Sequence, residues 1–465
     1  MASTNCWRCL ARPAQRLLLA PISVTASAPT LAAFSTSAQQ LARAADGGGT
    51  KHLRTGKRLL LGRKKRSPDK TKPPQAGERK AFRKRIQLSN DNALEVPGLE
   101  VLSAENAVNP DSVGKVFGVP AEVIDQLRAC EAFKSSQNWN LFRSPHLLVR
   151  KETVDLATQM TNAIEKKETL RLVVTGNRGS GKSILGLQAL ATGFLNKWVV
   201  INVPEGQELT TAATEYSTIP NSKMFSQPVY TVKLMQTMHQ TNQSILSQHK
   251  VELDHMHLPI SVTRNMTLTA LLNATKEPDF AWPVFEAFWK ELLLPGRPPI
   301  LFSLDGLAHI MRISQYRSPA FELIHSHDLA LIRMFTDALG GKTAFANGAA
   351  ILGVTAKGNA PIIPSMEKAI AHAVAAQNGE AVPARDPFFR KYDERVFDSL
   401  RGVKVLDVQG VSKTEARALM EYWAASGILR SRIDEKEVSE KWTMAGGGVV
   451  AEMERVAFYD LRATS

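Results

Sequence analysis

Short runs of mostly apolar residues recur through the middle of the chain, and each has the length of one buried strand. The runs cover residues 170–175, 198–203, 299–305 and 348–355. Between them, apolar residues recur with the spacing of one helix face, over residues 184–196, 230–247, 282–294 and 328–339. Apolar strands that alternate with helices are typical of a parallel sheet covered on both faces. The pattern therefore predicts an α/β core.

The pattern changes after this core. Four prolines among small residues at 357–392 indicate an interdomain loop with a short helix. An apolar run at 403–408 predicts a further strand. Ser412, with Glu415 three residues later, forms a capping box that predicts the start of a helix. We interpret residues 376–465 as an α-rich lid domain that closes over the core.

The first 45 residues contain four arginines but no lysine and no acidic residue, and they are rich in Ser, Thr and Ala. This composition is typical of a mitochondrial transit peptide. We assign residues 1–42 to the transit peptide and expect cleavage between Phe34 and Arg43. The chain is therefore predicted to enter the mitochondrial matrix.

The net charge of +14 is concentrated near the N-terminus. Residues 51–85 contain 15 Lys or Arg residues and two acidic ones, so the chain from residue 86 onward is close to neutral. Such a segment has too few apolar residues to fold alone, and we interpret residues 43–90 as a disordered basic arm. It is either a solvated linker or, as the clustering of charge favours, an arm that binds RNA phosphates. The candidate RNA-binding residues are Arg63, Lys64, Lys65, Arg66, Arg79, Lys80, Arg83, Lys84 and Arg85.

Several other classes of protein are disfavoured by the sequence. No apolar run approaches the length of a membrane-spanning helix. Three cysteines are too few for a disulfide framework. Two His-x-His pairs have no cysteine partners, so a zinc site is not expected.

The strongest chemical motif lies between the first predicted strand and its helix. Gly176–Ser183 reads GNRGSGKS and matches the P-loop pattern G-x-x-x-x-G-K-[ST] in full. Backbone N–H groups of such a loop surround the α- and β-phosphates of a nucleotide, the lysine reaches the β- and γ-phosphates, and the last hydroxyl binds Mg²⁺. The candidate nucleotide-binding residues are Gly176, Asn177, Arg178, Gly179, Ser180, Gly181, Lys182, Ser183 and Thr355.

Two further strand ends complete this prediction. Asp305 ends the third predicted strand and is expected to hold Mg²⁺ together with Ser183. Thr355 ends the fourth, where it either contacts the γ-phosphate or simply terminates the strand. ATPases of the AAA+ type usually have a glutamate after the acidic residue, whereas this chain has Gly306. Because a general base contributes about 10²–10⁴-fold to a rate, we predict weak or absent hydrolysis.

The assembled motifs resemble the fungal form of the mitochondrial small ribosomal subunit proteins of the death-associated-protein family. The resemblance covers roughly residues 95–465 and rests on the P-loop and on 112–120, 139–143, 303–306, 325–331, 412–417 and 446–448. It implies a place in the head of the small subunit, a bound guanine nucleotide and a contribution to a bridge with the large subunit. The implied partners are small-subunit rRNA and neighbouring ribosomal proteins.

These observations lead to one main hypothesis and one alternative. The main hypothesis is a structural ribosomal protein that holds GTP or GDP, with ATP possible, together with Mg²⁺. Its expected fold is a P-loop NTPase core, AAA+-like or STAND-like, at 151–375. An N-terminal extension at 91–150 is expected to pack on this core. The alternative is a free mitochondrial AAA+-like ATPase that acts on proteins or membrane complexes.

Overall fold

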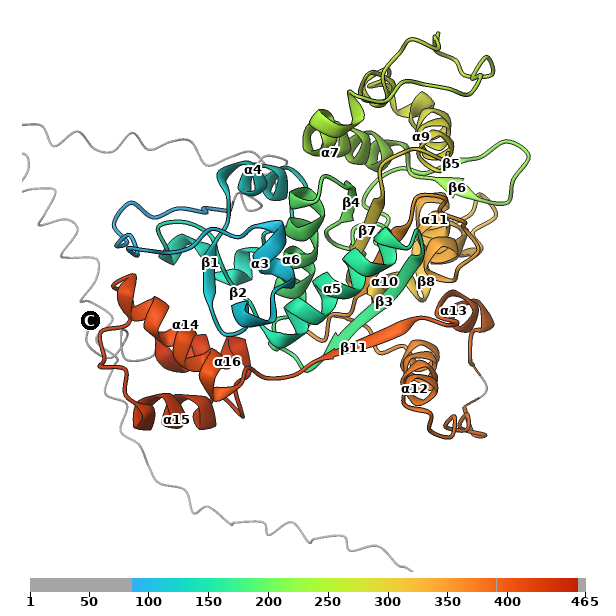
Figure 1. The fold of residues 1–465 in the computed structure, drawn as a ribbon. Coiled ribbons are helices and arrows are strands. Elements are labelled where there is room, and N and C mark those ends of the chain that lie inside the picture. The colour runs from blue at the N-terminus through green and yellow to red at the C-terminus, as the bar shows by residue number, and fades with distance from the viewer. Residues whose placement is uncertain (1–85, 359, 390, 459–465) are drawn as a thin grey trace, which may run out of the picture. The chain divides into compact units, whose positions relative to one another are not determined.

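The computed structural model describes residues 86–358, 360–389 and 391–458. Its centre is a parallel sheet of five strands in the order β11-β3-β10-β7-β4 (Figure 1). The strands are β3 (Thr169–Gly176), β4 (Val199–Val203), β7 (Ile300–Asp305), β10 (Ala349–Val354) and β11 (Lys404–Val408). All four strands expected in the core are confirmed, and the fold is α/β with a parallel sheet.

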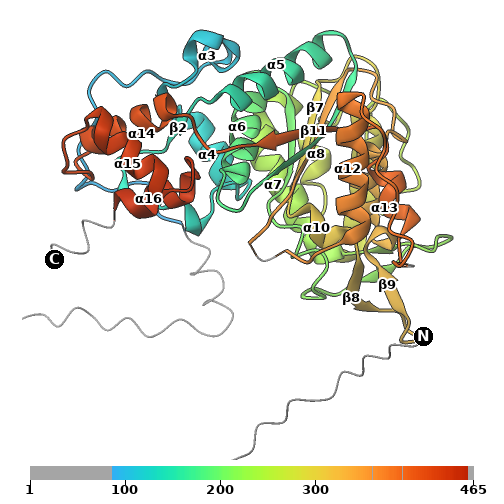
Figure 2. The ribbon, with the colours of Figure 1, turned by 90° about the horizontal axis from the view of Figure 1, so that it is seen from below.

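The place of β11 differs from the sequence interpretation, which assigned residues 403–408 to the lid. β11 instead pairs in parallel with β3, with Val405 opposite Val173, and forms one edge of the central sheet. Figure 2 shows β11 running from the α12–α13 side of the molecule towards the C-terminal helices. An apolar run predicts that a strand exists, but it does not identify the partner strand when the partner is more than 200 residues away.

Each face of the sheet carries its own hydrophobic core, because side chains alternate between the two faces along a strand. In β7, Phe302 and Leu304 belong to one core, while Leu301 belongs to the other. The first core is covered by α7 (Pro228–Leu246), α9 (Pro278–Leu292) and α11 (Ala330–Leu339). The second is covered by α4 (Ala121–Ala129), α5 (Lys151–Glu165) and α6 (Lys182–Leu195).

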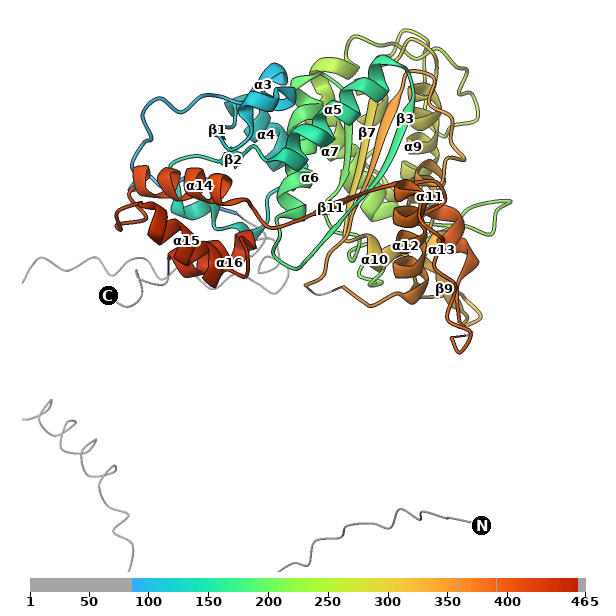
Figure 3. The ribbon, with the colours of Figure 1, turned by 60° about the horizontal axis from the view of Figure 1, so that its bottom comes forward.

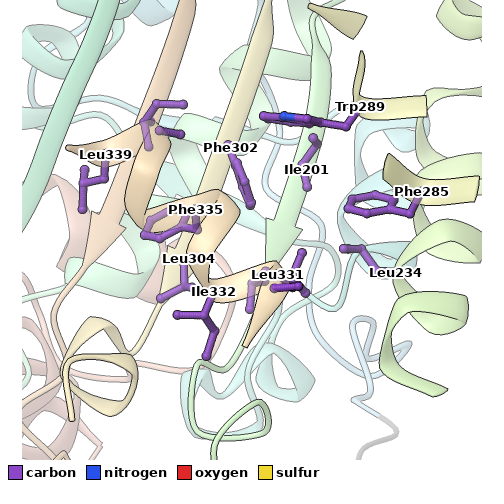
Figure 4. Packing of buried hydrophobic residues seen from close by; sticks show 14 of the residues in the cluster. Ile201, Leu234, Phe285, Trp289, Phe302, Leu304, Leu331, Ile332, Phe335 and Leu339 are labelled. Carbon is purple, nitrogen blue, oxygen red and sulfur yellow. The ribbon is translucent and has the colours of Figure 1, made fainter. Parts of the chain in front are cut away.

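Aromatic side chains fill the centre of the first core. The ring of Phe302 lies edge-on to Trp289 of α9 at 5.9 Å and to Phe335 of α11 at 5.0 Å between centroids. Figure 4 shows this packing together with Phe285 and Leu234. The apolar spacing that predicted helices over 230–247, 282–294 and 328–339 therefore arises from residues that face this core.

The region from 357 to 392 holds a longer helix than expected. α12 (Pro364–Asn378) has 15 residues and packs beside β11, and α13 (Glu394–Ser399) follows it. Pro364 occupies the first turn of α12, where the missing N–H costs nothing. The expected short helix is an underestimate, because a proline in this position begins a helix instead of breaking one.

The C-terminal helices form a small unit against the N-terminal extension. They are α14 (Lys413–Ala425), α15 (Glu435–Met444) and α16 (Val450–Ala457). The predicted capping box of Ser412 and Glu415 at the start of α14 is confirmed. Figures 1 and 3 show these helices beside the β1–β2 pair, and their shared core includes Phe142 of the extension.

The remaining α-helices and strands are short. They are α3 (Ala104–Val108), β1 (Val116–Gly118), β2 (His146–Leu148), β5 (Ser217–Thr218), β6 (Phe225–Ser226), α8 (Leu268–Leu272), α10 (Leu307–Ile310), β8 (Ile313–Arg317) and β9 (Leu323–His325). Among the residues that the structure describes, no helix has both the length and the apolar character needed to cross a membrane.

Candidate nucleotide-binding site

The P-loop connects β3 to α6, and its backbone requires glycine. Gly176, Gly179 and Gly181 have φ angles of +142°, +77° and +98°. A Cβ atom at Gly176 would lie 2.5 Å from the carbonyl oxygen of Val408 in β11. At Gly179 it would lie 2.9 Å from Cβ of Ala451 in α16. The loop is therefore packed tightly between the edge strand and the lid.

Lys182, the first residue of α6, is buried inside this loop. Its Nζ donates hydrogen bonds to the carbonyl oxygens of Gly176 at 3.0 Å and Asn177 at 2.5 Å. Burial and repulsion from Lys357 lower the pKa of Lys182, and the carboxylates of Asp305 and Asp407 oppose this effect. The ammonium is thus held at the centre of the loop, where phosphate oxygens would provide compensating negative charge.

Ser183 and Asp305 come together as the sequence predicts for a magnesium site. The Ser183 hydroxyl donates a hydrogen bond of 2.8 Å to Oδ2 of Asp305. The other carboxylate oxygen, Oδ1, is buried and has no hydrogen-bond partner in the described part of the chain. A hydroxyl beside a carboxylate with an unsatisfied oxygen fits Mg²⁺, which prefers oxygen ligands and keeps several waters. The residues present therefore fit the expected ion, which Ser183 and Asp305 would hold.

The position after Asp305 has a backbone that disfavours a glutamate. Gly306 has a φ of +82°, in the left-handed region that side chains other than glycine adopt with strain. Its N–H donates to the carbonyl oxygen of Val354, which fixes the turn at the ends of β7 and β10. The backbone conformation of this turn therefore favours glycine at position 306.

Thr355 lies at the end of β10, next to the P-loop strand. Its hydroxyl donates to the carbonyl oxygen of Val174 at 2.9 Å, and it also lines the cavity described below. This geometry accommodates both interpretations of Thr355. The hydrogen bond to Val174 is consistent with a residue that terminates the strand. The position of Thr355 on the cavity wall permits a contact with phosphate.

A cavity of about 530 Å³ extends from the P-loop between the N-terminal extension and the lid. Its polar end is lined by Lys182, Ser183, Thr355 and Lys357. Its apolar end is lined by aromatic and aliphatic side chains of the extension and the lid, namely Trp139, Phe142, His146, Leu419 and Trp423. The size and the division into a cationic and an apolar end suit a nucleotide, with phosphates at the loop and the base under the lid.

The lid contacts the loop directly. The backbone N–H of Ala451, at the start of α16, donates to the carbonyl oxygen of Gly179 at 3.1 Å. Gly448 makes the preceding turn possible, because a Cβ at this residue would lie 2.2 Å from the carbonyl oxygen of Val411. Glu454 of α16 also lines the cavity. The described structure is therefore closed over the P-loop.

Besides Lys357, which lines the cavity, sequence reasoning missed two cationic residues of the site. Buried Arg150 donates to the carbonyl oxygens of Ser180 at 2.9 Å and Gln409 at 2.7 Å, and it thereby joins the extension, the P-loop and the end of β11. Lys134 forms an ion pair with Asp305. Neither residue belongs to a local motif, and their roles depend on contacts with distant segments, so nothing in the sequence near them indicates the site.

His146 was also missed, and it forms the centre of an aromatic cluster at the apolar end. Its ring centroid lies 4.0 Å from that of Tyr422 and 4.3 Å from that of Phe142. Burial lowers the pKa of His146 to about 3. The imidazole is therefore neutral in the folded protein at physiological pH.

Acidification is expected to destabilise the fold through His146. An unfolded histidine has a pKa near 6.5, so below that pH the unfolded chain binds a proton that the folded chain excludes. The stabilisation is fully present above pH 6.5 and decreases as the pH falls towards 3. We expect His146 to account for a loss of about 2 kcal/mol between pH 7 and pH 5. Urea denaturation at both pH values should show a smaller loss for His146→Phe, and equal losses would contradict the assignment.

Other candidates lie away from the cavity or outside the described residues. Arg417 pairs with Glu421 at 2.8 Å on the surface of α14. In the residues that the structure describes, no three His, Cys, Asp or Glu side chains form a group that could hold a metal. The transit peptide and the nine arm cations fall within residues 1–85, which are not described. The predicted arm extended to residue 90, but Leu88 is buried in the second core.

Comparisons with known proteins all find similarity to ribosomal proteins. The model of the family described as mitochondrial ribosomal death-associated protein 3 matches residues 147–456. The small ribosomal subunit protein mS29 of Neurospora crassa is 50% identical over 469 residues, which is 100% of each chain. The protein of the same name from Schizosaccharomyces pombe is 22% identical over 352 residues, or 74% of this chain and 71% of its own. The family match includes the P-loop, Asp305 and Thr355, whereas Lys134 precedes it.

Proposed function

This chain belongs to the mitochondrial ribosomal death-associated protein 3 family and is a small-subunit protein of the mitochondrial ribosome, and from that premise we propose that it retains a purine nucleotide as a structural component. The observation that carries the proposal is the meeting of Ser183 with Asp305 beside the buried Lys182. The order β3-β10-β7 supports it, because an additional strand separates the P-loop strand from the strand that ends in Asp305. We therefore propose that the core is an AAA+-like or STAND-like P-loop fold.

The same site supports retention of the nucleotide rather than turnover. Gly306 occupies the position after Asp305, and its positive φ disfavours a glutamate there. The closed lid also limits access of water and exchange of ligand. We propose GTP or GDP with Mg²⁺ as the bound species, on the family resemblance, with ATP as the alternative.

The nucleotide can be identified directly. Acid extraction of protein purified from native small subunits, followed by chromatography, is expected to release about one purine nucleotide per chain. The purified protein should hydrolyse that nucleotide more slowly than about 1 s⁻¹, the lower end for typical enzymes. A chain that carries no nucleotide would refute the proposal. Faster turnover, together with sedimentation as a free oligomer away from small subunits, would favour the ATPase alternative.

We further propose that the basic arm binds small-subunit rRNA and that the folded part contributes to a bridge with the large subunit from the small-subunit head. The support for the arm is the concentration of positive charge in residues 51–85 beside a near-neutral remainder.

The proposal of a bridge follows from the family resemblance. Subunits that lack the protein should reassociate poorly in a sedimentation assay, and normal reassociation would remove it from the bridge.

Deletion of residues 51–85 is expected to weaken binding to an rRNA fragment and to reduce its dependence on salt. Each lysine or arginine that neutralises a phosphate contributes about 0.7–0.9 to the slope of log K against log salt. Removal of the nine candidate cations should therefore reduce the slope by several units. Replacement of the exposed lid residues Arg417 and Arg455 by glutamine is the control and should leave the slope nearly unchanged. An unaltered slope in the deletion variant would exclude the arm from the RNA interface.

A further inference from the structure

Lys134 lies in the N-terminal extension, in the turn region between α4 and the short 3-10 helix Ser135–Gln137, and its side chain reaches the end of β7. The turn is firmly anchored. The neighbouring Phe133 is buried and packs edge-on against Trp139 at 5.3 Å. Oε1 of Gln137 accepts hydrogen bonds from the backbone N–H of Lys134 at 2.8 Å and from Nε1 of Trp139 at 2.7 Å. The lysine is thus presented to the site from a fixed backbone.

The ammonium of Lys134 contacts Oδ2 of Asp305, the oxygen that also accepts the Ser183 hydroxyl. These are the two side chains that would bind Mg²⁺ in a P-loop site. Lys134 also lines the cavity, so its charge faces the space in which phosphates are expected. A positive group of this chain therefore lies at the place where a P-loop protein normally depends on a metal ion.

The arrangement differs from an ordinary surface ion pair. The Lys134 side chain is 28% exposed and that of Asp305 is 12% exposed. An ammonium group has three N–H donors, so it can bind the carboxylate and still donate to phosphate oxygens. It carries one positive charge, so it attracts phosphate but polarises it less than Mg²⁺ does.

We propose that Lys134 is a second phosphate-binding lysine that makes nucleotide retention largely independent of Mg²⁺. This inference rests on the proposed nucleotide site. Lys182 binds from within the loop, and Lys134 binds from the extension at the terminal phosphate, next to Asp305. Because Lys134 belongs to the extension, bound nucleotide also fastens this segment to the core.

The competing explanation is that Lys134 only neutralises Asp305 and stabilises the fold. The two explanations differ in the response to removal of the metal. If Lys134 contacts phosphate, its loss makes binding dependent on Mg²⁺. If it only neutralises Asp305, its loss reduces stability and leaves the response to Mg²⁺ unchanged.

The test is the affinity for GDP of the full chain freed of its bound nucleotide, measured by calorimetry in excess Mg²⁺ and in excess EDTA. For the unsubstituted protein, we expect chelation to weaken binding less than about threefold. For Lys134→Gln, we expect chelation to weaken it at least about tenfold, which is about 1.4 kcal/mol. Lys134→Arg should restore much of the tolerance to EDTA. Lys233→Gln is the matched control, since Lys233 pairs with Glu131 at 2.9 Å outside the cavity.

The outcomes separate this inference from the proposed function. The inference is overturned if the unsubstituted protein binds GDP in Mg²⁺ but its affinity falls more than about tenfold in EDTA. That result leaves the nucleotide site intact. The same holds if Lys134→Gln and the unsubstituted protein respond equally to EDTA. If the protein binds neither GDP nor ATP in either buffer, the proposed nucleotide site and the inference about Lys134 are both overturned. If Lys134→Gln fails to fold, a loss of affinity above about tenfold in EDTA for the unsubstituted protein still overturns the inference.

Discussion

Lys182→Ala is expected to lose nucleotide binding almost completely, with an affinity at least about 100-fold weaker than that of the unsubstituted chain. The buried Nζ lies between loop carbonyl oxygens, where it can donate charge-assisted hydrogen bonds to phosphate. Removal of one partner from a buried charged interaction costs about 2–5 kcal/mol. The measurement is the nucleotide content after purification, together with a calorimetric titration.

The control for this variant is Lys166→Ala, since Lys166 is an exposed lysine just after α5. We expect this control to retain nucleotide fully. The circular dichroism spectrum of Lys182→Ala should match that of the unsubstituted chain, because the helix begins at a backbone position fixed by Gly181. Undiminished nucleotide content in Lys182→Ala would remove the P-loop from the proposed site.

Glu291→Ala is expected to destabilise the fold by about 3–5 kcal/mol, the range for breaking a buried ion pair. Glu291, in α9, is fully buried and accepts hydrogen bonds from Arg297 at 2.7 Å, His255 at 3.0 Å and the backbone N–H of Leu253 at 2.7 Å. Alanine would leave the buried guanidinium of Arg297 without this partner. Chemical denaturation measures the loss.

Glu286→Ala on the same helix is the matched control. Glu286 pairs with Lys290 at 2.9 Å, but both side chains are about half exposed, so the loss should stay below about 0.5 kcal/mol. The double variant Glu291→Met with Arg297→Met should recover much of the stability, because no unpaired charge remains buried. A loss at Glu291 no greater than at Glu286 would contradict the assignment.

The core and the P-loop end of the candidate site were predictable because their determinants are local. Strand runs such as 299–305 are mostly apolar, and a P-loop places its lysine and serine at fixed offsets from its glycines. Asp305 could be recognised because it ends one of these runs. The meeting of Ser183 and Asp305 then follows from the parallel order of the strands, whose C-terminal ends share one edge.

The other side of the cavity was not predictable, because it depends on contacts between distant segments. Lys134 and Asp305 are separated by 171 residues, and Arg150 and Gln409 by 259. β11 was placed in the wrong unit for the same reason. The apolar pattern of a strand indicates which of its residues are buried. The strand with which it pairs is determined by packing across the whole sheet.

The order of the strands has a consequence for biogenesis. β3 is flanked by β10 and β11, which follow it by more than 170 and 220 residues, and Ala451 of the lid completes the loop. A chain is synthesised from its N-terminus, so the P-loop segment exists long before the strands that support it, and such distant pairings form late in folding. We therefore expect nucleotide uptake to be among the last events of maturation. Occupancy would then mark a complete chain, ready to join its ribosomal partners, and would distinguish it from a truncated product.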